Sequence, residues 1–247
     1  MRFLTLLYHI WFYIIVALPI IVMSPVLLVL TFSEKTYPHF FKVARIWAYI
    51  VLYGMGCPPR VKGREKMKKG QAYMLVANHT SMTDIMLMLV TARNPFVFVG
   101  KKELVKIPIF GFFYKRVVIM VDRGNTNSRM GVYRRAQRRL RQGTGICIFP
   151  EGGVPDDTQI VLDRFKSGAF RLAIAHQIPL VPISFYDNKK RLPFDLDAAG
   201  PGIVRAQVHD VIATQGMGEG EVDRFRESVR NLILIDLTRH QKKEATP

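Results

Sequence analysis

The chain has 247 residues, of which 49% are hydrophobic, and its 36 lysines and arginines outnumber 19 aspartates and glutamates to give a net charge of +17. This length suits one α/β domain, alone or with an appendage. The basic balance suits an anionic membrane surface, a phosphorylated substrate or a nucleic acid as partner. Two isolated cysteines, Cys57 and Cys147, exclude a disulfide scaffold and a cysteine-based zinc site, and they fit a reducing cytosolic environment.

The chain begins with an apolar segment that is long enough to cross a bilayer. Residues 3–32 contain no charged side chain, and about 20 apolar residues suffice for a transmembrane helix. A cleaved signal peptide fits less well, because the segment is too long and no A-x-A site closes it. Pro19 and Pro25 are expected to kink or divide a helix here. A second, broken apolar stretch follows at residues 40–55.

Two membrane geometries are open for residues 1–57. The first segment can span the bilayer, or the two stretches can form a helical hairpin that lies in one leaflet. Lys35, Lys42 and Arg45 follow the first segment, whereas a single basic residue precedes it. This asymmetry predicts that the rest of the chain is cytoplasmic. A pair of ordinary buried core helices is the remaining interpretation.

A histidine and an aspartate, His79 and Asp84, lie five positions apart after the apolar run 72–77. An imidazole oriented by a carboxylate can take a proton from a hydroxyl at neutral pH. In a regular helix five residues turn the side chain by roughly 500°, so the pair would point about 140° apart. The two can meet only if His79 precedes a helix and Asp84 lies in its first turn. Residues 81–84, Ser-Met-Thr-Asp, indicate such a start as a capping box. The alternative is a capping aspartate and an ordinary loop histidine.

From residue 58 onward, short β-like runs alternate with helical ones, which predicts an α/β sheet with helices packed on it. Pro182 inside one expected strand indicates an edge or a bulge. The expected strands are residues 73–77, 96–99, 117–121, 145–149, 180–185 and 203–208, and the expected helices are residues 84–92, 127–141, 166–177 and 222–239.

The helix expected at residues 127–141 has one apolar side and one basic side. No aromatic residue interleaves with the arginines, and no nucleic-acid-binding motif surrounds them. A solvated or membrane-facing basic side is therefore preferred to a nucleic-acid interface. The arginines are Arg134, Arg135, Arg138, Arg139 and Arg141.

Groups suited to an anionic ligand follow three of the expected strands. Residues 149–153, Phe-Pro-Glu-Gly-Gly, leave a strand where open α/β sheets bind ligands. Adjacent glycines let backbone amides approach an anion, and Glu151 can accept hydrogen bonds from hydroxyls. Lys101 and Lys102 follow a second strand and Arg123 closes a third, as recognition of a phosphate requires. Each also suits a plain turn or a solvated charge pair.

Four sequence blocks stand in one order between residues 60 and 190. The blocks are Asn78-His79-x4-Asp84, Gly111 followed by Val121-Asp122-Arg123, Phe149-Pro150-Glu151-Gly152, and Ile178-Pro179-Leu180-Val181-Pro182-Ile183. In this arrangement the chain resembles the glycerolipid acyltransferase family, and within it the bacterial 1-acylglycerol-3-phosphate O-acyltransferases. The resemblance implies a mixed β-sheet flanked by helices over residues 58–247, with a membrane-embedded helical segment at residues 1–57.

The resemblance implies transfer of a fatty acyl group from acyl-ACP or acyl-CoA to the sn-2 hydroxyl of 1-acylglycerol-3-phosphate, which gives phosphatidic acid. His79 is then the general base and Asp84 its orienting partner. The implied partners are the bilayer, a lysophospholipid and the acyl carrier protein or CoA thioester, without a nucleic acid. No metal and no cofactor beyond the thioester is implied. The implied location is the bacterial cytoplasmic membrane, with the catalytic domain on its cytoplasmic face.

The resemblance also distributes the binding residues, with one departure from the family pattern. Most members continue the third block as Gly-Thr-Arg-Ser, whereas this chain has Gly-Gly-Val-Pro at 152–155. Arg164 or Lys166 can supply the missing charge. The departure keeps another acceptor open, such as a lyso-aminolipid. A non-catalytic basic protein that binds lipid or nucleic acid is the alternative outside the enzymes. The implied substrate-binding residues are Lys101, Lys102, Arg123, Glu151, Gly152 and Gly153, and Pro182 lies on the acyl side.

Overall fold

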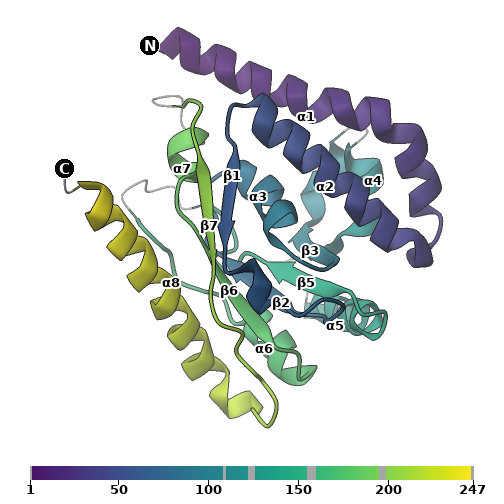
Figure 1. Cartoon of the computed structure of the whole chain (residues 1–247). Coiled ribbons are helices and arrows are strands. Elements are labelled where there is room, and N and C mark those ends of the chain that lie inside the picture. Colours follow the sequence, from purple (N-terminus) through teal and green to yellow (C-terminus); the bar gives the residue numbers. More distant parts are fainter. Residues whose placement is uncertain (1, 108–109, 122–125, 155–159, 195–198, 246–247) are drawn as a thin grey trace.

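A seven-stranded β-sheet forms the centre of the molecule (Figure 1). The computed structural model describes residues 2–107, 110–121, 126–154, 160–194 and 199–245. The strands are β1 Pro59–Lys62, β2 Met74–Ala77, β3 Phe96–Lys101, β4 Ile119–Val121, β5 Gly145–Ile148, β6 Leu180–Phe185 and β7 Val204–Val208. Their order is β1-β7-β6-β2-β5-β3-β4. Neighbouring strands are parallel except for the antiparallel pair β6–β7, so the sheet is mixed, as the resemblance implies.

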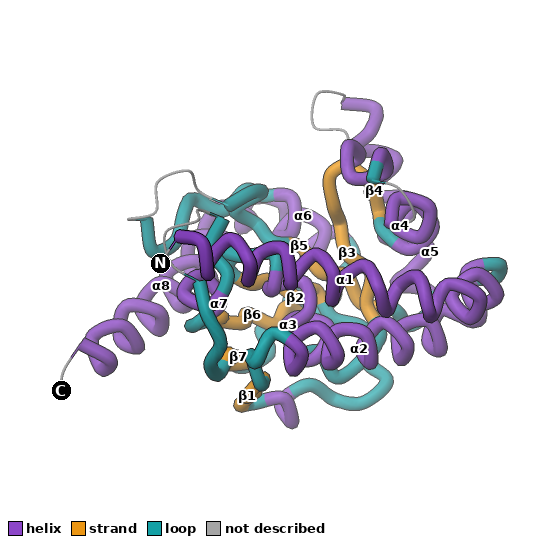
Figure 2. The backbone as a smooth tube through the Cα atoms, turned by 90° about the horizontal axis from the view of Figure 1, so that it is seen from above, coloured by secondary structure: helices purple, strands orange, loops and turns teal. Residues whose placement is uncertain are grey.

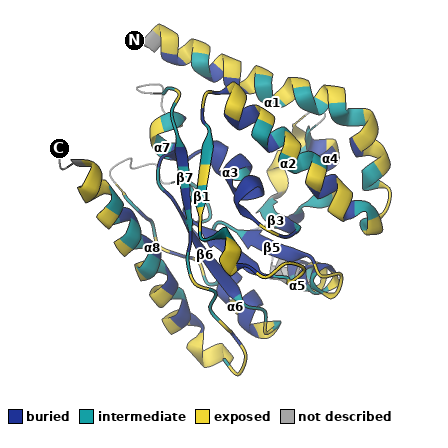
Figure 3. Cartoon of the chain, in the orientation of Figure 1, coloured by how far each residue is buried: buried dark blue, intermediate teal, exposed yellow. Residues whose placement is uncertain are grey.

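Helices cover both faces of the sheet, which confirms the α/β fold class. They are α1 Arg2–Thr31, α2 Tyr37–Gly54, α3 Thr83–Thr91, α4 Phe110–Val117, α5 Thr126–Arg141, α6 Gly168–Ala175, α7 Asn188–Arg191 and α8 Val222–Ala245. Because side chains alternate along a strand, Leu75 and Ala77 of β2 join the core under α2 and α3. Met74 and Val76 join the core that contains α6 and α8. Figure 3 shows the strands between these two layers as mostly buried.

The first two helices form a hairpin that lies against the α/β domain. Figure 2 shows α1 running alongside α2 across the molecule. The Trp47 indole donates to the Val16 carbonyl at 3.1 Å, and the Trp11 indole donates to the Gly54 carbonyl at 2.9 Å. By length and composition, residues 3–31 of α1 suffice to cross a membrane. Most apolar side chains of α1 are exposed, so the interpretation as an ordinary buried core helix pair is wrong for α1.

Pro19, Pro25 and Pro182 affect the secondary structure less than the sequence predicts. α1 continues through Pro19 and Pro25 as one helix, so the expected division is wrong. Pro182 does not mark an edge, because β6 lies between β2 and β7. It does lie at a bulge. Leu180 is bridged to Ile212 and Ile183 is paired with Val208, so two residues of β6 face three residues of the neighbouring chain segment.

Two strands depart from the sequence expectation for physical reasons. β1 was not expected, because Pro-Arg-Val-Lys offers one aliphatic side chain to an edge strand that is partly exposed. The expected strand at residues 117–121 begins only at Ile119, because α4 continues to Val117. β-branched valines at 117 and 118 suggest a strand, yet Val117 packs in the core from the end of a helix.

Arg139 corrects the picture of α5 as a helix with a uniformly solvated basic side. Arg139 is 9% exposed, whereas the other four arginines of this side lie at the surface. The Arg139 guanidinium lies 4.9 Å from the centre of the Tyr37 ring and 3.8 Å from a carboxylate oxygen of Glu34. Arg139 therefore joins α5 to the turn between α1 and α2.

Candidate active site

The parallel strands β6, β2 and β5 lie side by side, so their carboxyl ends meet at one edge of the sheet. Ligands bind beyond such ends in open α/β sheets. The segment after β2 carries His79, the segment after β5 carries Glu151, and the segment after β6 carries Asn188. Three parts of the chain that are distant in sequence thus meet at one place.

The structure brings His79 and Asp84 together as their spacing predicts. His79 lies in the loop after β2, and Asp84 is the second residue of α3. The His79 Nδ1 and Asp84 Oδ2 atoms are 2.8 Å apart. The Asp84 side chain is fully buried, and the His79 side chain is 20% exposed. The imidazole is therefore accessible at the surface of a site whose carboxylate is closed to water.

Backbone and side-chain donors surround the Asp84 carboxylate. Oδ2 accepts the N–H groups of Thr80 at 2.6 Å and Ser81 at 2.9 Å. Oδ1 accepts the Asn188 amide at 2.6 Å. The expected capping box is half formed, because Asp84 accepts from Ser81 while the Ser81 hydroxyl accepts from the Thr83 N–H instead. A carboxylate with these partners is held in one orientation toward His79.

The His79 ring has one nitrogen left for a substrate. Nδ1 faces Asp84, and the ring stacks on Phe149 with centroids 4.4 Å apart. The imidazole lines a cavity of about 1430 Å³. With Nδ1 engaged, Nε2 is the nitrogen that can receive a hydroxyl proton.

Glu151 connects two loops at the site. One carboxylate oxygen accepts the His79 N–H at 2.7 Å, and the other accepts the Asp163 N–H at 2.9 Å. The residue is 5% exposed, and burial raises the pKa of its carboxyl to about 7. Glu151 thus holds the backbone of His79 and lies in the cavity wall. Its hydrogen bonds in the described chain are with the backbone amides of His79 and Asp163.

The cavity is large and apolar over most of its wall, and its lining also includes charged side chains. Its volume exceeds the roughly 300–1,000 Å³ that is usual for small-molecule sites. Helices α1, α2 and α4 supply apolar wall residues such as Tyr13, Trp47 and Phe113. His79 and Glu151 lie in the wall as well. A long hydrocarbon chain with a polar head is the class of ligand that this combination fits.

Gly152 and Lys166 form a tight contact at the turn after β5. Gly152 has a φ of +81°, and a Cβ atom at this position would lie 2.6 Å from the Lys166 Nζ. The Lys166 N–H donates to the Pro150 carbonyl at 2.8 Å. Both Gly152 and Gly153 line the cavity. Lys166 therefore places a cation beside the turn in which the family arginine is missing.

The remaining predicted binding residues either lie away from the cavity or are not described by the structure. Lys102, Arg164 and Lys166 are exposed and do not line the described cavity. Pro182 lies inside β6, between two strands, rather than in the cavity wall. Lys101 ends β3, but its side chain lies outside the described part, and Arg123 falls outside the described residues altogether.

Sequence reasoning missed the contribution of α7. Lys189 and Lys190 line the cavity, and Asn188 contacts Asp84. A signal was present, because an Asn-Lys-Lys-Arg run follows the strand that ends at Phe185. Like Lys101 and Arg123, these cations lie at or just beyond the end of a strand.

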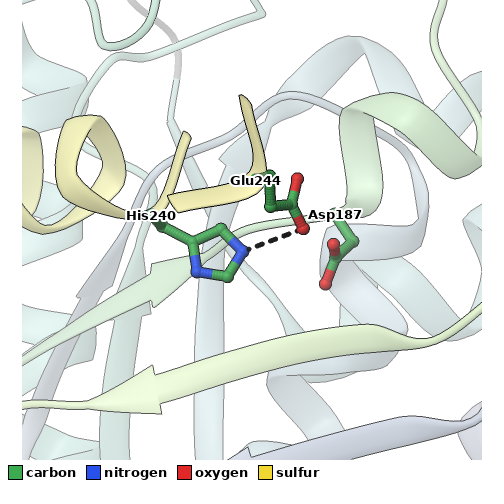
Figure 4. Close-up of side chains that lie close together, drawn as sticks. All are labelled: Asp187, His240 and Glu244. Carbon is green, nitrogen blue, oxygen red and sulfur yellow. Dashed lines mark ion pairs between the residues drawn. The ribbon is translucent and has the colours of Figure 1, made fainter. Parts of the chain in front are cut away.

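Three residues that can bind a metal ion also gather near α7. Potential ligand atoms of Asp187, His240 and Glu244 lie within 4.8 Å of one another (Figure 4). The Asp187 carboxylate already accepts the Arg205 Nε and backbone N–H, each at 2.8 Å. Glu244 is paired with Arg205 and Lys190. These matched charges favour an ion-pair network that joins α8 to α7 over a metal centre.

The raised pKa of Glu151 predicts a pH-dependent stability. In the folded chain the Glu151 carboxyl keeps its proton up to about pH 7, whereas the ordinary pKa of a glutamate is 4.5. The free energy of unfolding therefore falls as the pH rises from 4.5 to about 7. Glu151→Gln removes the titrating group but leaves one acceptor oxygen for two N–H donors, so it should be less stable than wild type near pH 4.5. This deficit should shrink as the pH rises to about 7, by at most on the order of 3 kcal/mol, because only wild type loses stability in this range.

The measurement is the melting temperature of both proteins in detergent across this pH range. Glu65→Gln, at an exposed position, is the control and should follow wild type throughout. A Glu151→Gln curve parallel to wild type at every pH would contradict the prediction.

Comparison with known proteins gives the chain a family. A family model described as Acyltransferase matches residues 58–186. The 1-acyl-sn-glycerol-3-phosphate acyltransferase alpha of Mus musculus is 28% identical, over 78% of this chain and 68% of its own. The human 1-acyl-sn-glycerol-3-phosphate acyltransferase beta is 28% identical, over 78% of this chain and 71% of its own.

A solved structure shows the same fold. The crystal structure of the 1-acyl-sn-glycerophosphate acyltransferase PlsC from Thermotoga maritima has a TM-score of 0.80, with 24% identity over 98% of both chains. The family model covers more than half of the chain, so the interpretation as a non-catalytic binding protein is wrong. The chain belongs to the acyltransferase family and is an O-acyltransferase.

Proposed function

We propose that the enzyme transfers a fatty acyl group from an acyl thioester to the sn-2 hydroxyl of 1-acylglycerol-3-phosphate, which gives phosphatidic acid. The observation that carries the proposal is the His79–Asp84 pair, whose imidazole lies in the wall of a large, mainly apolar cavity. The relatives named as 1-acyl-sn-glycerol-3-phosphate acyltransferases support this acceptor. The thioester is carried by acyl carrier protein or by coenzyme A.

His79 acts as the general base in this reaction. Nε2 takes the proton of the acceptor hydroxyl while its oxygen attacks the thioester carbonyl, and Asp84 stabilises the imidazolium that forms. The carbon–sulfur bond then breaks, and the thiolate leaves with the proton that the imidazolium returns. The products are an ester and a free thiol. The thioester is already activated, so the scheme requires no metal and no further cofactor.

We place the α1–α2 hairpin in one leaflet of the bacterial inner membrane, with the domain on the cytoplasmic face. Exposed apolar side chains of α1, such as Val22 and Val29, support this orientation. Other residues of the same helix line the cavity. The positive charges that follow residue 32 support the cytoplasmic face.

The acceptor phosphate is held by cations near Gly152 and α7, with Lys166 in place of the family arginine. Its Nζ lies against Gly152, whose backbone lines the cavity. Lys189 and Lys190 add positive charge to the wall. The missing arginine favours one second candidate, in which the same transfer acts on a lyso-aminolipid. This acceptor would not depend on Lys166.

His79→Ala should lower turnover by at least ~10²-fold, because general base catalysis is lost. The assay is formation of phosphatidic acid by detergent-solubilised protein, from lysophosphatidic acid with acyl-ACP and with acyl-CoA. His39→Ala, at an exposed position on α2, is the matched control and should retain wild-type turnover. A His79→Ala enzyme with a near-normal rate would remove the base assignment.

Lys166→Ala should raise the apparent KM for lysophosphatidic acid about tenfold, because one charge-assisted contact with phosphate is lost. Arg123→Ala should act in the same direction. Gly152→Ala should also raise KM, since its Cβ would displace the Lys166 amine. Gly143→Ala is the control, because Gly143 also has a positive φ, of +72°, but its Cβ would meet no atom within 4 Å. An unchanged KM in both cation variants would show that the phosphate is bound elsewhere, and a lyso-aminolipid would be tested next.

Val22→Asp combined with Val29→Asp should weaken membrane binding, because both side chains are more than 60% exposed on α1 and a charge resists transfer into lipid. The measurement is flotation of the purified protein with anionic lipid vesicles. Ile235→Asp, on the exposed side of α8, is the control and should float like wild type. Equal flotation of all three proteins would argue against the proposed orientation.

A further inference from the structure

Asn188 is a buried residue that neither the reaction scheme nor the family blocks use. It is the first residue of α7 and has no exposure to solvent. Its Nδ2 donates to the Asp84 Oδ1 at 2.6 Å, across 104 positions of sequence. The contact is on the oxygen of Asp84 that does not face His79.

The chemistry of this contact fixes the Asn188 side chain. An ionised carboxylate only accepts hydrogen bonds, so the amide must turn its NH₂ group toward Asp84. The Asn188 Oδ1 is then buried without a partner in the described part of the chain. A buried, unpaired oxygen is unfavourable for stability. The bond to Asp84 is therefore the contact that accounts for an asparagine at this buried position.

The chain anchors α7 on several sides, so this contact has a rigid support. Asp187, next to Asn188, is bound by Arg205 of β7, and Lys190 is paired with Glu244 of α8. On the other side, the Ser81 hydroxyl donates to the Leu192 carbonyl at 2.7 Å. The loop that carries His79 and the short helix that carries Asn188 are thus joined at two points.

We propose that Asn188 is a positioning residue for acyl transfer, which holds the Asp84 carboxylate in the orientation that His79 requires. The inference rests on the proposed role of His79 as the base. Asn188 does not touch the reacting atoms. It acts through Asp84, as the third member of a His79–Asp84–Asn188 chain of hydrogen bonds.

Removal of the amide should change both the rate and the charge balance at His79. In Asn188→Ala, Asp84 loses one neutral donor, so its charge acts more strongly on the imidazolium. In Asn188→Asp, a second carboxyl lies against Asp84, and once both are ionised it adds a negative charge beside His79. The lost donor in one variant and the added charge in the other both favour the imidazolium, so the acid limb of the kcat profile should move to higher pH.

Other charged groups face the same site and stay unchanged in these variants. Glu151 accepts a hydrogen bond from the His79 backbone, the Asp163 N–H donates to Glu151, and Lys189 and Lys190 line the cavity. Asp187 is paired with Arg205. These groups are the same in all the proteins compared. A shift of the acid limb of the kcat profile between variants is therefore due to the substitution at residue 188.

The test measures kcat, KM and the pH profile of kcat for wild type, Asn188→Ala and Asn188→Asp. We expect kcat of Asn188→Ala to fall at least about tenfold, a part of what the base itself supplies, with little change in KM. The matched control is Asn94→Ala. Asn94 is also buried, but it binds backbone groups of residues 68–71 on another loop. This control should leave the acid limb in place.

The outcomes separate the possible roles. A lowered kcat with an unmoved acid limb in both variants would make Asn188 merely structural and overturn the proposal, as would a wild-type kcat in Asn188→Ala. Melting temperatures show whether each variant folds. If Asn188→Ala does not fold, the proposal is tested with the nearly isosteric Asn188→Asp alone. A fully active His79→Ala would instead reject the proposed base, whatever the Asn188 variants show.

Discussion

The Asp84 carboxylate is completely enclosed by protein, and a buried charge is stable only if the protein replaces the water around it. Backbone amides of the His79 loop satisfy one oxygen, and the Asn188 amide satisfies the other. These donors meet the carboxylate only if the loop folds back onto the start of α3 and α7 closes over it. The orientation of the His79 ring follows from this requirement, because Nδ1 takes the remaining position at Oδ2.

The helix α1 has two apolar sides, of which one lines the cavity and the other is exposed. Phe12 is 2% exposed and lies in the cavity wall, whereas Val22 is 71% exposed on the outside. The α/β domain alone would therefore leave the cavity without part of its wall. In the proposed membrane orientation the outer side contacts lipid and the inner side contacts the acyl chain. An acyl chain that enters the site is then surrounded by apolar side chains throughout, which avoids exposure of hydrocarbon to water.

The parts of the site that the sequence predicts are those with a local signal. His79 and Asp84 are five positions apart, and the residues between them indicate the start of a helix. Fully buried strands such as β2 and β6 are short apolar runs. Asn188 has no such signal, because its partner is 104 positions away and an asparagine in a polar run is typical of a turn. Arg139 shows the same limit, since its burial depends on Tyr37 and Glu34 from another part of the chain.

The short helix α7 links the proposed base to the proposed phosphate site. Its first residue supports Asp84, and the next two line the cavity. Arg205 and Glu244 hold this helix through charges that come from β7 and α8. A change that loosens these ion pairs acts on the base and on the bound acceptor together, so it should alter kcat and KM jointly. A change confined to Lys166 acts on the acceptor alone. The C-terminal helix, far from His79 in sequence, thereby becomes part of the support on which the geometry of the reaction depends.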